Sequence, residues 1–98
     1  MNSSKLSMID QSASLLKSVG HPIRFKIMLA LSNKKSMTVT ELVELLNVDQ
    51  PVMSLHLAVL RKKDIIIVKK DGKQSMYSIE DKSMQQIVNI IYNTQRKI

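Results

Sequence analysis

The chain has 98 residues, no cysteine and a net charge of +7. This length predicts one domain over 1–98, and the lack of cysteine excludes disulfides, thiolate metal sites and cysteine chemistry. No apolar run approaches the roughly 20 residues that span a bilayer, and the polar N-terminal stretch lacks a signal-peptide core. We therefore expect a cytoplasmic protein without a membrane partner. The basic charge favours nucleic acid as partner over a charge that serves only solubility.

Apolar residues at helical spacing predict a first helix over 5–19 and a second over about 22–32. Pro22 suits the first turn of the second helix, where its missing N–H costs little. The second helix is apolar on several sides, so we expect it to be central in the domain. The first helix carries a stripe formed by Ile9, Ala13 and Leu16.

Two short helices with a tight turn between them are predicted over 39–63. Thr38 and Glu41 have the spacing of a capping box, which starts the first of these helices. That helix ends near Asn47, a residue type that tolerates the left-handed conformation. Asp49 is a good N-cap for the second helix. The pair has the helix-turn-helix pattern, which many helical domains also contain.

A basic β-hairpin is predicted over 65–79. Its first strand is the β-branched run 65–68, and Asp71-Gly72 is a strong hairpin-turn signal. A last helix is predicted over 81–96. Its apolar stripe consists of Met84, Ile87, Val88, Ile91 and Tyr92.

This order of elements resembles a winged helix-turn-helix DNA-binding domain, and more narrowly the ArsR/SmtB family of small bacterial transcriptional repressors. The resemblance covers about 21–79. It is carried by HPIRFKIMLAL, by TVTELVELLNVDQPVMSLHLAVLRKKDIIIV and by the wing VKKDGKQSMYSI. The flanking helices match in position and amphipathicity rather than in sequence. The resemblance implies a mainly α fold with a small β-hairpin, in a homodimer whose first and last helices form the interface and whose fourth helix enters the DNA major groove.

The residues themselves also favour a homodimer. Apolar stripes on two terminal helices gain burial in a two-fold dimer, and a domain this small benefits most from such burial. The alternative is that both stripes pack inside one subunit. The interface candidates are Ile9, Ala13, Leu16, Met84, Ile87, Val88, Ile91 and Tyr92.

Helical spacing divides the fourth helix into a core side and an outer side. We assign Met53, His56, Leu57 and Leu60 to the core side. The base-reading candidates are Gln50, Val52, Ser54 and Leu55. Gln50 and Ser54 can hydrogen-bond base edges or phosphates. Leu55 stands where the family more often has a basic or polar residue, so it either meets a thymine methyl group or marks weak sequence reading.

Basic residues flank this helix. The segment 61–73 holds six basic residues against two acidic ones, a net charge of +4. The candidates for phosphate contacts are Arg61, Lys62, Lys63, Lys69, Lys70, Lys73 and Gln74. Each cluster also has a structural explanation, since cations stabilise a helix C-terminus and charged residues protect a hairpin edge from aggregation.

The sensor sites of the resembled family have no counterpart in this sequence. The family's cysteine site falls on 41–45, where no thiol exists, and no histidine follows Asp81 on the last helix. We therefore predict no metal site and no cofactor, with an effector that is a small molecule, a partner protein or nothing. An enzyme is not expected, because the sequence lacks a phosphate-binding glycine loop, an acid/base pair and an activated nucleophile.

The sequence therefore predicts a sequence-specific DNA-binding transcriptional regulator, namely a dimeric repressor that binds double-stranded DNA at a palindromic operator. Two alternatives stay open. One is a winged-helix module that binds protein through its terminal helices, and the other is an architectural protein that binds DNA without sequence preference.

Overall fold

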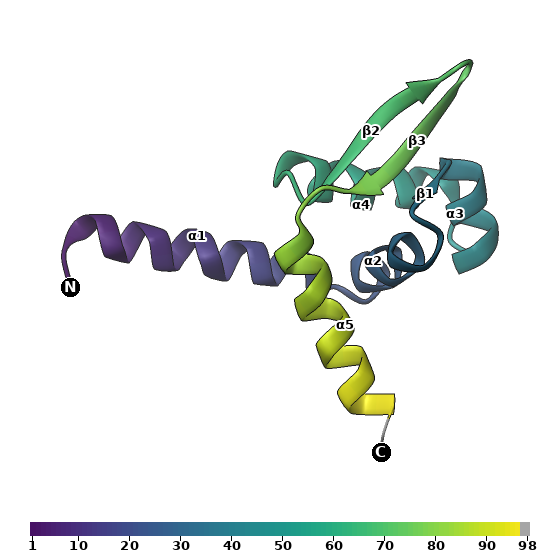
Figure 1. The fold of residues 1–98 in the computed structure, drawn as a ribbon. Coiled ribbons are helices and arrows are strands. Elements are labelled where there is room, and N and C mark those ends of the chain that lie inside the picture. Colours follow the sequence, from purple (N-terminus) through teal and green to yellow (C-terminus); the bar gives the residue numbers. More distant parts are fainter. Residues whose placement is uncertain (97–98) are drawn as a thin grey trace.

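The computed structural model describes residues 1–96, and this part contains five helices and a three-stranded antiparallel sheet (Figure 1). The order confirms the predicted winged helix-turn-helix fold. The elements are α1 (Ser3–Val19), α2 (Pro22–Lys34), β1 (Ser36–Met37), α3 (Val39–Leu46), α4 (Gln50–Lys62), β2 (Ile66–Asp71), β3 (Gln74–Ile79) and α5 (Lys82–Arg96).

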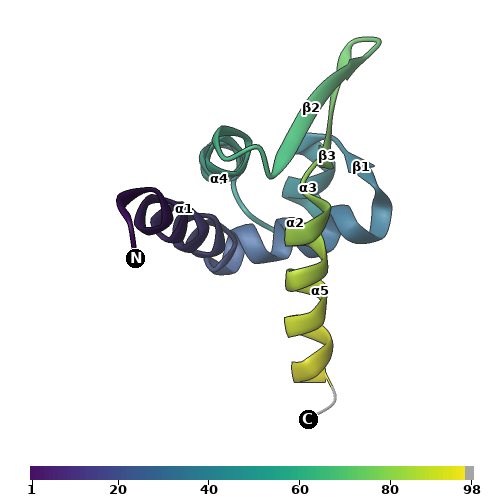
Figure 2. The same ribbon diagram turned by 60° about the vertical axis from the view of Figure 1, so that its left-hand side comes forward.

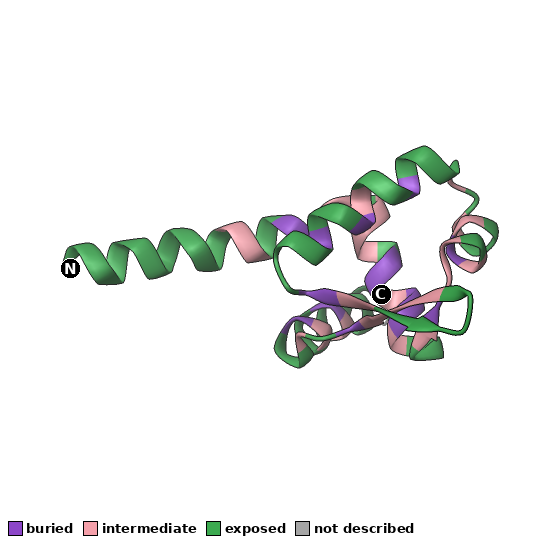
Figure 3. Ribbon diagram, turned by 90° about the horizontal axis from the view of Figure 1, so that it is seen from above, coloured by how far each residue is buried: buried purple, intermediate pink, exposed green. Residues whose placement is uncertain are grey.

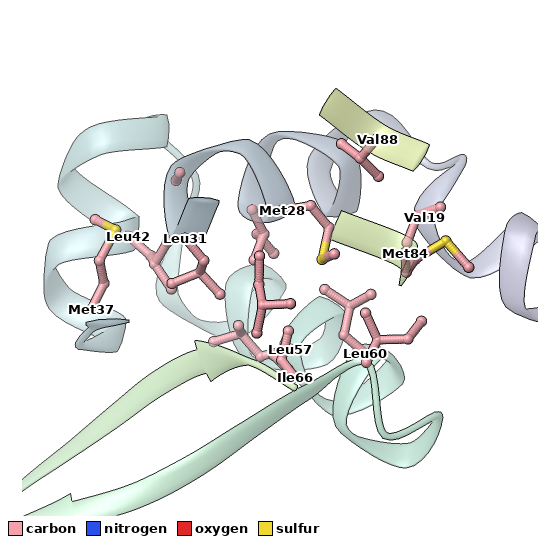
Figure 4. Close-up of a cluster of buried hydrophobic side chains, with 14 of the residues drawn as sticks. Val19, Met28, Leu31, Met37, Leu42, Leu57, Leu60, Ile66, Met84 and Val88 are labelled. Atoms are coloured by element: carbon pink, nitrogen blue, oxygen red, sulfur yellow. The ribbon is translucent and has the colours of Figure 1, made fainter. Parts of the chain in front are cut away.

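The hydrophobic core surrounds α2, as its several apolar sides predict. Ile27, Met28 and Leu31 of this helix are fully buried, and every other helix and the base of the sheet pack around them (Figure 4). The surrounding core residues are Val19, Met37, Leu42, Met53, Leu57, Leu60, Ile65, Ile66, Ile79, Met84 and Val88. Since small domains have little core to spare, this one cluster holds all the other elements in place.

Local signals fix the helix ends around the helix-turn-helix. The predicted capping box is present, because Thr38 accepts from the backbone N–H of Glu41 and the Glu41 carboxylate accepts from that of Thr38. Asn47 ends α3 in the left-handed conformation, with φ 54°. Asp49 stands at the N-cap of α4, as predicted, but its side chain makes no capping hydrogen bond. Pro51 in the first turn has no N–H, which removes one of the donors that a cap needs.

The sheet has one strand more than the sequence predicts. Its order is β1-β3-β2, and β1 pairs Ser36 with Ser78 and Met37 with Tyr77. Two residues are too few to show the alternation by which a strand is predicted from sequence. This short strand anchors the inner strand of the hairpin to the C-terminal end of α2.

The hairpin rises from the core as a wing beside α4 (Figures 1 and 2). Its strands are longer than predicted, because β2 continues to Asp71, which pairs with Gln74. Gly72 and Lys73 therefore form the turn, and Gly72 takes a positive φ of 65° that a side chain would disfavour. Ile66 and Ile79 pair at the base and are buried in the core.

Much of α1 and one side of α5 lie outside the core. The first 13 residues are exposed, and α1 extends away from the rest of the subunit (Figure 3). None of the helices within 1–96 is long and apolar enough to cross a membrane. The exposed apolar residues of the two terminal helices are Leu6, Met8, Ile9, Leu16, Ile87, Ile90, Ile91 and Tyr92.

Two of the predicted interface residues lie inside the subunit instead. Met84 and Val88 are 6% and 0% exposed and belong to the core cluster drawn in Figure 4. They occupy the side of α5 that packs against α2, where Asn89 also donates to the Ser32 hydroxyl at 3.1 Å. The stripe on α5 is thus divided between its own core and a surface, which spacing alone does not resolve.

Candidate nucleic-acid interface

Helix α4 has one buried side and one exposed side, as its spacing predicts. Met53, Leu57 and Leu60 are at most 1% exposed, whereas Leu55 is 69% exposed. The other base-reading candidates, Gln50, Val52 and Ser54, are also exposed. The core therefore holds the apolar side of α4, and these four side chains are turned toward solvent.

His56 lies on the flank of α4 and connects it to the corner between α1 and α2. Its Nδ1 is 3.1 Å from Nη1 of Arg24, whose Nε donates to the carbonyl oxygen of Ser18 at 2.6 Å. The rings of His56 and His21 lie 4.4 Å apart between centroids. The sequence predicts a packed histidine at this position, but the long-range contact with Arg24 is not visible in any spacing.

The hydrogen bonds of this cluster use imidazole nitrogens as acceptors. A guanidinium can only donate, so Nδ1 of His56 accepts and the ring proton lies on Nε2. His21 likewise uses Nδ1 to accept from the backbone N–H of Ile23, which caps α2. Partial burial lowers the pKa of His56 below its ordinary value of 6.5, and the neighbouring His21 and Arg24 lower it further.

The cations at the end of α4 have different surroundings. Arg61 and Lys62 are exposed, and no hydrogen-bond partner within 1–96 holds either side chain. Lys63, the third phosphate candidate, donates to the hydroxyl of Ser14 on α1 at 2.7 Å. The side chains of Arg61 and Lys62 are thus available to contact phosphates, whereas that of Lys63 is hydrogen-bonded to α1.

The wing presents its cations on both of its faces. Paired residues of an antiparallel ladder share a face, and successive residues alternate. Lys69 pairs with Met76 and Lys70 pairs with Ser75, so the two lysines point to opposite faces. Lys73 lies in the turn at the tip, next to the exposed Gln74. A single surface cannot contact Lys69 and Lys70 equally.

Among the residues 1–96, no group of three or more His, Cys, Asp or Glu side chains is arranged to hold a metal ion. The two histidines lie together, but each already uses Nδ1 within the fold. Within the described residues their surroundings contain Arg24 and no carboxylate partner within hydrogen-bonding distance, which does not suit a divalent cation.

The pH dependence of stability follows from His56. Because its pKa is lower in the folded chain than in the unfolded one, its neutral form stabilises the fold fully above pH 6.5, and this contribution is lost as the pH falls through the folded-state pKa. We expect the free energy of unfolding, measured with urea, to be lower at about pH 5.5 than at about pH 7.5. His56→Gln keeps an acceptor for Arg24 but cannot titrate, so its decrease should be smaller. His21 is present in both proteins, and an equal decrease in both would contradict the assignment to His56.

Known proteins share both the sequence pattern and the fold of this chain. Residues 21–68 match the sequence model described as bacterial regulatory protein, arsR family. The transcriptional repressor PagR of Bacillus anthracis is 30% identical over 83 residues, which cover 85% of this chain and 83% of PagR. The HTH-type transcriptional repressor SmtB of Mycobacterium tuberculosis is 31% identical over 81 residues, which cover 83% of this chain and 59% of SmtB.

Solved structures of transcriptional repressors have the same fold as this chain. The crystal structure of PagR superposes with a TM-score of 0.80 at 29% identity, covering 88% of this chain and 98% of PagR. The repressor BigR of Xylella fastidiosa gives a TM-score of 0.81 at 28% identity, covering 96% of each chain. Sequence and architecture match over the helix-turn-helix and beyond it, and this chain belongs to the ArsR family of bacterial regulatory proteins.

Proposed function

We propose that this chain is a DNA-binding transcriptional repressor that acts as a homodimer on a palindromic operator. The observation that carries the proposal is an outward-facing side of α4, held on the core and flanked by the free cations of Arg61 and Lys62 and by the basic wing. Membership in a family of bacterial regulatory proteins, and relatives named as transcriptional repressors, support it. The proposed role is that of a binding protein in the cytoplasm, not of an enzyme.

In the proposed complex α4 lies in the major groove, which is wide enough to admit a helix. Gln50, Val52, Ser54 and Leu55 then meet the base edges. Phosphates are contacted by the cations at the end of α4 and on the wing, and this electrostatic term provides most of the affinity for any DNA sequence. These phosphate-contact residues are Arg61, Lys62, Lys63, Lys69, Lys70, Lys73 and Gln74.

The proposed dimer covers the apolar surface that α1 and α5 leave exposed. Ile9 and Leu16 are each about half exposed on α1, and Ile91 and Tyr92 are more than 40% exposed on α5. Burial of a fully exposed side chain of this size gains about 1.5–3 kcal/mol, so side chains that are already about half buried gain roughly half as much, once in each subunit of a two-fold dimer. Ala13 and Ile87, also exposed, complete the proposed interface.

We further propose that the protein works without the metal sites that its family often uses. It has no cysteine, and α5 has no histidine. Its effector, where one exists, would then act through another chemistry, such as a small organic molecule or a partner protein.

Selection from genomic DNA fragments, repeated over a salt series, tests the proposed function. We expect one palindromic sequence to be enriched, because two α4 helices related by a two-fold axis read inverted half-sites. Gln50→Ala should change the preferred bases within this site. Equal binding of all fragments would instead indicate an architectural protein, and no binding would indicate a module that binds protein.

Removing charge from the wing should weaken DNA binding regardless of sequence. Each phosphate contact that Lys70→Gln and Lys73→Gln remove should make the slope of log K against log salt shallower by about 0.9. Fluorescence anisotropy with operator and with unrelated DNA measures both effects. Lys26→Gln, which removes an exposed charge from α2, is the matched control. Lys69→Gln tests the opposite face of the wing, and unchanged affinity and slope in all three wing variants would exclude the wing from the interface.

The interface proposal predicts a particle of twice the chain mass of 11.1 kDa at micromolar concentration. Ile9→Glu and Ile91→Glu should each dissociate it, because both residues are exposed in the subunit and a buried carboxylate without a partner is costly. Light scattering gives the mass, and circular dichroism reports whether the fold is kept. Leu45→Glu is the control, since Leu45 is 61% exposed on α3, away from both terminal helices (Figure 1). A wild-type mass of one chain would contradict the proposal.

A further inference from the structure

The exposed side of α4 carries apolar residues where a helix that faces water would carry polar ones. Val52, Leu55 and Val59 are 39%, 69% and 36% exposed. Their spacing of i, i+3 and i+7 places them along one edge of the helix. They contribute little to the core, so their apolar character needs another explanation.

The terminal helices do not account for this edge. Exposed apolar residues on α1 and α5 can cover one another in a dimer, whereas Leu55 is exposed on α4, on the same helical face as the exposed Lys62 at i+7. A partner for this surface must therefore be polyanionic and must also present apolar groups. Duplex DNA meets both conditions, since phosphates surround a groove in which some bases carry a methyl group.

The apolar group that a base presents in the major groove is a methyl group on C5 of a pyrimidine. Thymine carries it by nature, and it is the one major-groove feature that an aliphatic side chain can read. Val52 and Leu55 are separated by a rise of about 4.5 Å along the helix axis, which is close to the roughly 3.4 Å between successive bases of one strand. The two side chains can thus reach neighbouring base pairs.

We propose that Leu55 and Val52 are specificity-determining residues that recognise C5-methyl groups of pyrimidines in the operator. Gln50 and Ser54 would contact hydrogen-bonding edges in the same groove. The inference rests on the proposed function, and it adds to that function the chemical class of base that α4 selects. The operator half-site is then expected to contain thymines at the positions that face these two side chains.

Replacing thymine by 2′-deoxyuridine removes the methyl group alone and keeps every hydrogen bond of the base pair. In the selected operator, this exchange is made at one thymine position at a time, symmetrically in both half-sites, and the Kd is measured by fluorescence anisotropy. We expect one or two positions at which the exchange weakens binding by roughly fourfold per half-site, the effect of burying about one methyl group.

The side chain responsible is identified by a double-mutant cycle. Leu55→Ala should abolish the difference between thymine and deoxyuridine at one position, and Val52→Ala at a neighbouring one. Ser54→Ala, an exposed neighbour on the same helix, should leave both differences unchanged. Leu55 and Val52 lie outside the core, and circular dichroism checks that the variants fold as the wild type does.

The outcomes separate the inference from the function on which it rests. An operator that is bound equally well with thymine and deoxyuridine at every position overturns the inference alone. The same holds if the difference survives in both Leu55→Ala and Val52→Ala. Absence of DNA binding overturns the proposed function together with the inference.

Discussion

Burial of one side of α4 is the constraint on which the other surfaces depend. Met53, Leu57 and Leu60 are buried against the core around α2, so the opposite side of the helix must face outward. The same burial fixes the start of β2, because Ile65 and Ile66 enter the core directly after the helix ends. The outer residues of α4 and the basic wing are thus positioned by a single apolar contact surface and not by contacts of their own.

The sequence contained enough information for the fold and for the two sides of α4. Helical periodicity, the Thr38–Glu41 capping box and the β-branched run before Asp71-Gly72 are local signals, and each one appears in the structure. The predictions failed where the outcome depends on distant partners. The two-residue strand β1 forms because β3, far along the chain, is available to pair with it.

The same limit applies to the candidate site. Spacing assigned His56 to the inner side of α4, yet its contact with Arg24 joins residues 32 positions apart and follows only from the tertiary fold. Spacing also grouped Met84 and Val88 with Ile87 and Ile91, since all four share a broad stripe. Packing of α5 against α2 divides that stripe, so that two residues complete the subunit and the others remain on its surface.

The hydrogen bond between Lys63 and Ser14 joins the end of α4 to the middle of α1, the helix that carries the exposed apolar stripe. The ammonium group of Lys63 has three N–H donors, so a DNA phosphate within reach could share this cation with the Ser14 hydroxyl. DNA binding and the position of α1 would then both depend on Lys63. Thermodynamic linkage makes such a dependence reciprocal. A shift of α1 that moves the Ser14 hydroxyl would then change the position of a cation at the end of α4, although Ser14 itself contacts no base.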